Sequence, residues 1–167
     1  MKKLLYIVLP ILILACEKPI KAQDSTLDNL DWQEMESALE LAAEEDKLIL
    51  IDVFAQWCPY CQRMQTEVYP ADEVEEVINK YFIPVRIDTE SEEGLTYHGN
   101  AFTQAEFAVA LQYRSVPTTY FMNANGEVLG QQPGFLPVDV FTQLLEYVGS
   151  GAHETQSFDE FNNGTNR

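Results

Sequence analysis

The sequence predicts an α/β fold in which a central mixed β-sheet carries helices on both faces. Segments with helical and strand-like patterns alternate along the chain, which is typical of a layered α/β domain. Residues 47–55 form a nearly unbroken apolar run, as a strand does when both faces of its sheet are covered. Two later strand-like segments, 118–122 and 127–131, flank Asn-Ala-Asn-Gly at 123–126, a turn sequence that indicates a hairpin.

The expected order of elements is helix, strand, helix, strand, helix, strand, strand, helix. Asp31 followed by Glu34 is a helix-start pattern, and apolar residues keep helical spacing as far as Glu45. A second helix is expected to begin at Pro59, because proline is favoured in the first turn, and to break at Pro70. The remaining elements are a helix over 72–81, a strand over 82–87, an acidic loop over 90–100, a capped helix over 103–113, strands over 118–122 and 127–131, and a helix over 138–148.

The 167 residues leave room for one domain between a leader and a tail. Residues 1–22 begin with a basic pair followed by an apolar run too short to span a bilayer, which is the layout of an export signal. Two processing sites fit, namely a lipoprotein box that would lipidate Cys16 and an ordinary cleavage near Ala22. We expect a linker over 23–30, a folded domain over 31–149 and a flexible tail over 150–167. The protein is therefore expected to be exported, either periplasmic or lipid-anchored in the cell envelope, and to meet the membrane only through such an anchor.

The charge of the chain excludes one class of partner. The formal net charge is −17, and removal of residues 1–22, with their four lysines and one glutamate, would leave −20. A surface of this sign repels nucleic acid and anionic lipid headgroups. We expect no nucleic-acid partner.

Cys58 and Cys61 are expected to carry the chemistry. They enclose Pro59 and Tyr60 at the point where the expected buried strand ends and the expected helix begins. Cys58 would lie at the helix N-terminus, where the partial positive charge of unpaired N–H groups favours thiolate over thiol. A thiolate attacks a disulfide, and a second cysteine one turn away resolves the mixed disulfide. Cys58 is therefore expected to be the nucleophile and Cys61 the resolving thiol.

Other uses of a cysteine pair fit the sequence less well. A zinc site needs four ligands, and His98 and His153 are scattered far from the pair. Covalent haem attachment needs histidine after the second cysteine, where Gln62 stands. A purely structural disulfide closing so short a loop would constrain the unfolded chain little. We expect neither a metal nor a cofactor.

Two segments of the chain resemble the thioredoxin superfamily. Residues 50–61, Leu-Ile-Asp-Val-Phe-Ala-Gln-Trp-Cys-Pro-Tyr-Cys, look like its active-site strand and turn, and Val-Pro-Thr at 116–118 resembles its second signature. The hairpin turn at 125–127 and Pro-Gly-Phe at 133–135 are also similar, so the resemblance covers roughly residues 31–148. It implies a thioredoxin-like fold and thiol:disulfide oxidoreductase activity. Within the superfamily the chain looks most like periplasmic SoxW-type proteins.

The resemblance also implies roles for residues near the cysteines. Pro117 would be the cis-proline that faces them, and the main chain of Val116 would hydrogen-bond the backbone of a substrate. Trp57, Pro59 and Tyr60 would form the surface on which that substrate docks.

Asp52, six residues before Cys58, matches the buried acid of thioredoxins. Burial would raise its pKa, so that it could take the proton of Cys61; the alternative is a solvated aspartate at an edge. Thioredoxins often pair this acid with a lysine, and Pro84 stands at the matching place here. On this reasoning, replacement of Asp52 by asparagine should leave stability level or raise it.

The expected function is disulfide exchange with protein substrates in the cell envelope. Asp52 favours the reducing direction, because it would activate the resolving thiol. A reductase there would need electrons from a DsbD-like membrane donor, and we expect it to act as a monomer. The alternative is a non-catalytic binding or chaperone module that uses the cis-proline groove without turnover.

Overall fold

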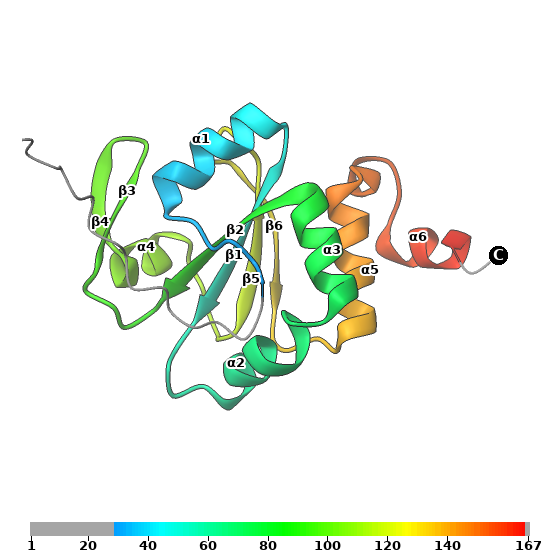
Figure 1. The fold of residues 1–167 in the computed structure, drawn as a ribbon, viewed down its shortest axis with the longest axis horizontal. Helices are drawn as coiled ribbons and strands as arrows, with labels where there is room; N and C mark the ends of the chain where they lie inside the picture. The colour runs from blue at the N-terminus through cyan, green and yellow to red at the C-terminus, as the bar shows by residue number, and fades with distance from the viewer. Residues whose placement is uncertain (1–28, 166–167) are drawn as a thin grey trace, which may run out of the picture.

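The computed structural model describes residues 29–165 and contains the predicted mixed sheet (Figure 1). The strand order is β2-β1-β5-β6. The central strand β1 (Leu48–Phe54) runs parallel to β2 (Phe82–Asp88) and antiparallel to β5 (Thr118–Met122), and β6 (Val128–Pro133) pairs with β5 as the hairpin predicts. The expected export signal, Cys16 and most of the expected linker lie outside the described residues.

Helices cover both faces of this sheet, as expected (Figure 1). α1 (Met35–Glu45) and α4 (Gln104–Ala110) pack on one face, and α3 (Asp72–Tyr81) and α5 (Val138–Gly149) pack on the other. Alternate residues of β1 enter the two cores, which explains why its sequence is apolar on both sides. Within residues 29–165, no helix has the length and apolar composition needed to cross a bilayer.

The helix that follows the cysteines has two parts. α2 (Pro59–Arg63) begins at the predicted proline, and a π-helix, η1 (Met64–Val68), continues it. The N–H of Tyr69 donates to the carbonyl oxygen of Met64 at 2.9 Å, which is the wide i to i+5 bond of a π turn. This turn places Met64, Val68 and Tyr69 in the core between the sheet and α5.

The prediction of a helix from Asp31 was wrong for its first turn. α1 begins at Met35, and its N-cap Glu34 makes no side-chain capping bond. The preceding residues follow β2 instead, where the N–H of Gln33 donates to the carbonyl oxygen of Pro84 at 2.8 Å and Gln33 bridges Val85. The outer edge of β2 offers backbone hydrogen bonds, and this segment takes them in preference to a helical turn.

The acidic loop expected over residues 90–100 contains a hairpin, formed by β3 (Gly94–Tyr97) and β4 (Asn100–Thr103). Its aromatic side chains hold it against α4, since the rings of Tyr97 and Phe102 lie 5.1 and 5.9 Å from the ring of Phe107. α4 then starts with the predicted capping box and ends at Ala110, three residues earlier than expected.

The segment after Gly149 also differs from the flexible tail that the sequence suggests. It contains a 3₁₀ turn, η2 (Ala152–Glu154), and a helix, α6 (Phe158–Thr165). The rings of Phe158 and Phe161 lie 5.4 and 5.5 Å from the ring of Tyr147 on α5, and the Tyr147 hydroxyl donates to the carbonyl oxygen of Gln156 at 2.7 Å. Aromatic packing therefore orders part of this segment.

Candidate active site

The two cysteines lie just beyond the C-terminal end of β1, where the chain enters α2. Cys58 is the N-cap of α2 and Pro59 its first residue, as the sequence predicts. Cys58 and Cys61 form a disulfide with their Cα atoms 5.2 Å apart. Both are buried, with 3% of Cys58 and 1% of Cys61 exposed.

The backbone around Cys58 favours negative charge on its sulfur. The N–H of Cys61 points at the Sγ atom of Cys58 at 3.1 Å, and the N–H of Gln62 donates to the Cys58 carbonyl oxygen at 3.1 Å. An N–H aimed at sulfur at the start of a helix stabilises a thiolate relative to a thiol. This arrangement suits Cys58 to be a nucleophile.

The second predicted signature lies against the disulfide. The peptide bond between Val116 and Pro117 is cis, as the resemblance implies, and Pro117 is buried at the start of β5. The carbonyl oxygen of Val116 lies 3.6 Å from the Sγ atom of Cys58. The carbonyl oxygen of Pro117 accepts the N–H of Gly134 at 2.8 Å, which ties in the segment that leads to α5. The fold thus joins residues that are about 60 positions apart in sequence.

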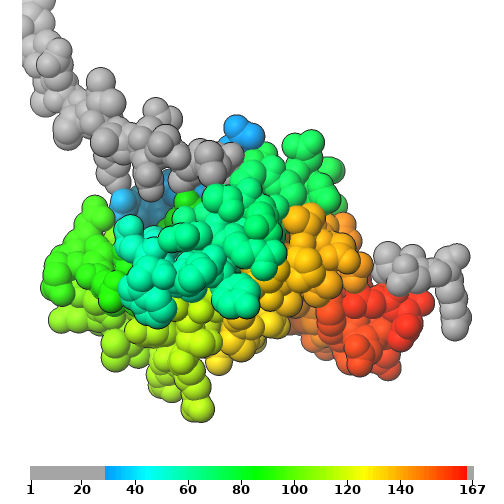
Figure 2. Space-filling model, turned by 90° about the horizontal axis from the view of Figure 1, so that it is seen from below, coloured from blue at the N-terminus to red at the C-terminus, as the bar shows by residue number. Residues whose placement is uncertain are grey.

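Exposed apolar groups surround the buried sulfur atoms. Trp57 is 65% exposed and Tyr60 is 58% exposed. The ring of Tyr60 lies 6.2 Å from that of Phe135, and the guanidinium of Arg63 lies 4.2 Å above the Phe135 ring. Figure 2 views this end of the molecule, where the surface around α2 meets that of the segment before β5. Trp57 and Tyr60 thus give the surface beside Cys58 an exposed aromatic character.

Asp52 is the buried acid that the sequence predicts, with 1% of its surface exposed. The register places it opposite Arg86 on β2, and the Nε atom of Arg86 lies 3.6 Å from the Oδ2 atom of Asp52. Pro84, which sequence matching put in the place of the usual cation, lies opposite Leu50 instead. A cation therefore does accompany Asp52. It is Arg86, two residues after the position that matching to thioredoxins indicates.

Two aromatic rings hold Arg86 in this position. Its guanidinium carbon lies 3.9 Å from the centre of the Trp32 ring and 5.5 Å from that of Tyr69, and the two rings are 5.2 Å apart in an edge-to-face arrangement. Tyr69 is completely buried; burial raises its pKa well above the ordinary value, and the negative charge of Asp52 raises it further. Sequence reasoning missed these partners, and its only available signal was an arginine within an apolar strand.

A second buried acid fixes the loop between β1 and α2. Asp88, at the end of β2, is 8% exposed, and its Oδ2 atom accepts the Nε2–H of Gln56 at 3.0 Å. Its Oδ1 atom accepts the N–H of Glu90 at 3.0 Å. The Nε2–H of Gln62 in turn donates to the carbonyl oxygen of Gln56 at 3.1 Å. These bonds restrain the loop that carries Trp57, and no motif in the sequence indicates them.

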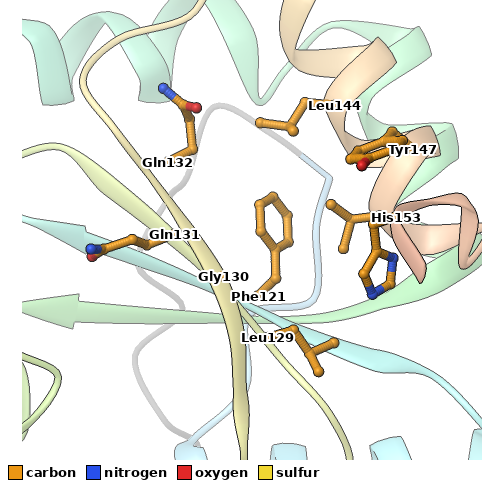
Figure 3. A pocket seen from close by; sticks show the side chains of 9 residues that line it. Phe121, Leu129, Gly130, Gln131, Gln132, Leu144, Tyr147 and His153 are labelled. Carbon is orange, nitrogen blue, oxygen red and sulfur yellow. The ribbon is translucent and has the colours of Figure 1, made fainter. Parts of the chain in front are cut away.

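Other candidate residues lie apart from the disulfide. His98 stands at the β3–β4 turn, where its Nε2 atom is 3.1 Å from the carbonyl oxygen of Asn125. His153 lines a cavity of about 170 Å³ between β6 and α5 (Figure 3), which none of the predicted site residues line. In the described part of the chain, no three or more His, Cys, Asp or Glu residues are grouped to hold a metal ion.

Comparison with known proteins assigns the chain to a family. The family model named thioredoxin-like domain matches residues 35–149. The chain belongs to the thioredoxin-like domain family. The predicted superfamily and the mixed-sheet fold are thereby confirmed for this thioredoxin-like protein. Its finer likeness to SoxW-type proteins stays a prediction.

The thioredoxin-like chain is also similar to individual proteins and solved structures. Over 118 residues it is 29% identical to the thiol:disulfide interchange protein DsbD of Vibrio cholerae, covering 70% of this chain and 18% of DsbD. The chain thus spans about a fifth of that relative's length. A thioredoxin-fold protein from Helicobacter pylori has a TM-score of 0.60 at 22% identity, covering 70% of this chain and 77% of that one. A thioredoxin from Thermus thermophilus has a TM-score of 0.57 at 25% identity, covering 71% and 86%.

Proposed function

We propose that this protein is a thiol:disulfide oxidoreductase of the cell envelope that exchanges disulfides with protein substrates through Cys58 and Cys61. The observation that carries the proposal is the Cys58 sulfur at the start of α2, with the Cys61 N–H directed at it and the Val116 carbonyl beside it. The name of the relative in Vibrio cholerae, a thiol:disulfide interchange protein, supports the same chemistry.

In the reducing direction the cycle begins with both cysteines reduced. The Cys58 thiolate attacks one sulfur of a substrate disulfide, which forms a bond between Cys58 and that sulfur and releases the other substrate sulfur as a thiolate. Cys61 then loses its proton and attacks the Cys58 sulfur. This second step forms the Cys58–Cys61 disulfide and releases the first substrate sulfur as a thiolate. Two electrons pass to the substrate, and a dithiol donor must return the protein to its reduced state.

We assign to Asp52 the acceptance of the Cys61 proton. Asp52 lies on the side of β1 that also carries Phe54, and Phe54 packs against Cys58 and Cys61. Since Cys61 is 1% exposed, bases in bulk solvent reach its thiol poorly, and an internal acceptor accelerates its ionisation. This role favours the reducing direction, because resolution of the mixed disulfide then proceeds quickly.

Substrate binding is assigned to the groups around the sulfur atoms. Trp57, Pro59 and Tyr60 offer exposed surface next to Cys58. The main chain of Val116, beside cis-Pro117, offers hydrogen-bonding groups to an extended substrate chain, in the manner of strand addition. The substrates are therefore proteins with an accessible disulfide in an extended segment.

Localisation and electron supply complete the proposal. We propose an exported monomer that is either lipid-anchored through Cys16 or released after cleavage near Ala22, and that draws electrons from a DsbD-like membrane donor. Metabolic labelling with a palmitate analogue is expected to tag the wild type and not Cys16→Ala. An unlabelled mature protein that begins at Gln23 would establish the ordinary signal instead.

An insulin-reduction assay on residues 29–167 tests the catalytic proposal. With a chemical dithiol as electron source, the wild type is expected to accelerate insulin reduction and Cys58→Ser to give the uncatalysed rate. If the wild type binds unfolded chains but does not accelerate insulin reduction, the protein is a non-catalytic binding or chaperone module. Equilibration of the Cys58–Cys61 couple with glutathione then gives the potential that decides the direction of exchange.

A further inference from the structure

Trp32 lies outside the part of the chain that the family model matches, since that match begins at residue 35. It belongs to the extended segment that Gln33 attaches to β2. Its ring nevertheless lies 3.9 Å from the Arg86 guanidinium, directly next to the ion pair with Asp52. A residue from outside the matched domain thus reaches the charge pair below the active site.

The surroundings of Arg86 explain why its position needs support. Its side chain is 15% exposed whereas Asp52 is 1% exposed, so Arg86 lies nearer to solvent than its partner. An arginine at the border of solvent gains hydration by turning outwards, and a distance of 3.6 Å to Asp52 is long for a charge-assisted hydrogen bond. Contacts with the faces of two aromatic rings oppose this movement, because cation–π attraction is strongest where water is excluded.

We propose that Trp32 and Tyr69 are positioning residues that hold the guanidinium of Arg86 against Asp52 and so set the pH range in which Asp52 accepts the proton of Cys61. The inference rests on the proposed function for its consequence in exchange, whereas its effect on Asp52 is measurable without any substrate. When the rings hold Arg86 in place, its positive charge favours the ionised carboxylate. When a ring is removed, Arg86 turns to solvent and the carboxylate holds its proton to a higher pH.

The groups that face Asp52 come from each element packed around it. Arg86 is opposite on β2, Thr119 is opposite on β5, and Tyr69 follows η1 with its hydroxyl close enough for the Asp52 charge to affect it. Cys58 and Cys61 on α2 lie beyond Phe54, the next residue on the same side of β1. Of these, Arg86 is the group that is positively charged at neutral pH, so its position against Asp52 favours the ionised carboxylate.

The test is a titration of the carboxyl carbon of Asp52 by nuclear magnetic resonance in reduced protein, with Asp52→Asn used to assign the signal. Trp32→Leu is expected to raise the titration midpoint by about one pH unit, and Arg86→Met by at least as much. Trp32→Phe, which keeps a ring, is expected to restore most of the wild-type midpoint. Lys80→Met is the matched control, because it removes another cation–aromatic contact, 4.6 Å from the Tyr81 ring, and should not move the midpoint.

The same variants are then compared in single-turnover release of a mixed disulfide, whose pH profile should move by the same amount. A midpoint that moves in Arg86→Met but not in Trp32→Leu overturns the inference, even if both variants lose stability. If Trp32→Leu does not fold, Arg86→Lys replaces it, because an ammonium lacks the planar face that stacks between rings, and an unchanged midpoint there overturns the inference too. A wild type that shows no exchange, together with shifted midpoints, would refute the proposed function and leave the positioning role intact.

Discussion

Replacement of Asp52 by asparagine tests the mechanism most directly. Asparagine has nearly the same shape but accepts no proton, so the attack of Cys58 should be unaffected and the attack of Cys61 should slow. General-base assistance contributes roughly 10²- to 10⁴-fold. Cys61 and Asp52 are each 1% exposed, which keeps solvent bases away from the thiol, so we expect a loss of at least about 100-fold in the second step.

Rapid mixing of reduced protein with an excess of a coloured aromatic disulfide separates the two steps. The first burst of coloured thiolate reports attack by Cys58 and depends on the disulfide concentration. The second reports resolution by Cys61 within the protein and does not. We expect Asp52→Asn to slow the second phase alone. Equal second phases in wild type and variant from about pH 6 to about pH 9 would refute the assignment, because the proton would then leave by a route independent of Asp52.

The structure also changes the expected effect of this substitution on stability. From sequence alone, loss of a buried charge should leave stability level or raise it, but Arg86 would now face a neutral amide. At 3.6 Å the attraction in the pair amounts to about 5 kcal/mol at an effective dielectric constant of about 20. Much of this is offset by the cost of burying Asp52, so a net destabilisation of about 1–2 kcal/mol is expected. Thermal unfolding of the reduced proteins measures it, with Asp52→Asn/Arg86→Met as the paired control.

Three further outcomes are expected. Cys58→Ser should abolish exchange, whereas Cys61→Ser should accumulate covalent mixed disulfides; alkylation followed by mass analysis checks the roles, and a more reactive Cys61 at neutral pH would reverse them. Gly126→Ala should lower the free energy of unfolding by about 1–3 kcal/mol in urea, because Gly126 has a φ of +82° and a Cβ atom there would meet the His98 ring; an unchanged midpoint would contradict this. The pKa of Tyr69 lies well above 10.0, so the folded protein holds this proton more tightly than the unfolded chain. Stability should therefore fall as the pH rises above about 10, and Tyr69→Phe should show a smaller fall in alkaline denaturation.

The sequence predicted most of the sheet and its covering helices because those elements depend on local patterns. The central strand is apolar throughout, and the hairpin after Met122 has turn residues at its centre. The β3–β4 hairpin was missed because three glutamates precede it and its strands are only four residues long. What stabilises it is contact with Phe107, which becomes visible only once the chain is folded.

The residues of the site that lie in short sequence motifs were predictable, and those that the fold brings together were not. Cys58, Cys61 and Pro117 were found because they sit in short motifs, and Asp52 because a lone acid interrupts an apolar run. Arg86 was not found, because its relation to Asp52 depends on the register of two parallel strands that α2, η1 and α3 separate along the chain. Trp32 was read as a helical residue, and nothing in its own neighbourhood indicates that it reaches across to Arg86.

The π-helix η1 makes the number of residues between Cys61 and Tyr69 as important as their identity. Each residue of an α-helix turns the following side chain by about 100°. If the same residues formed a regular α-helix from Pro59 onwards, the wide turn of η1 would be lost and Tyr69 would be rotated by roughly that angle away from Asp52. The wide turn takes up one extra residue and so directs Tyr69 toward Asp52. Engineering of this protein should therefore preserve this wide turn.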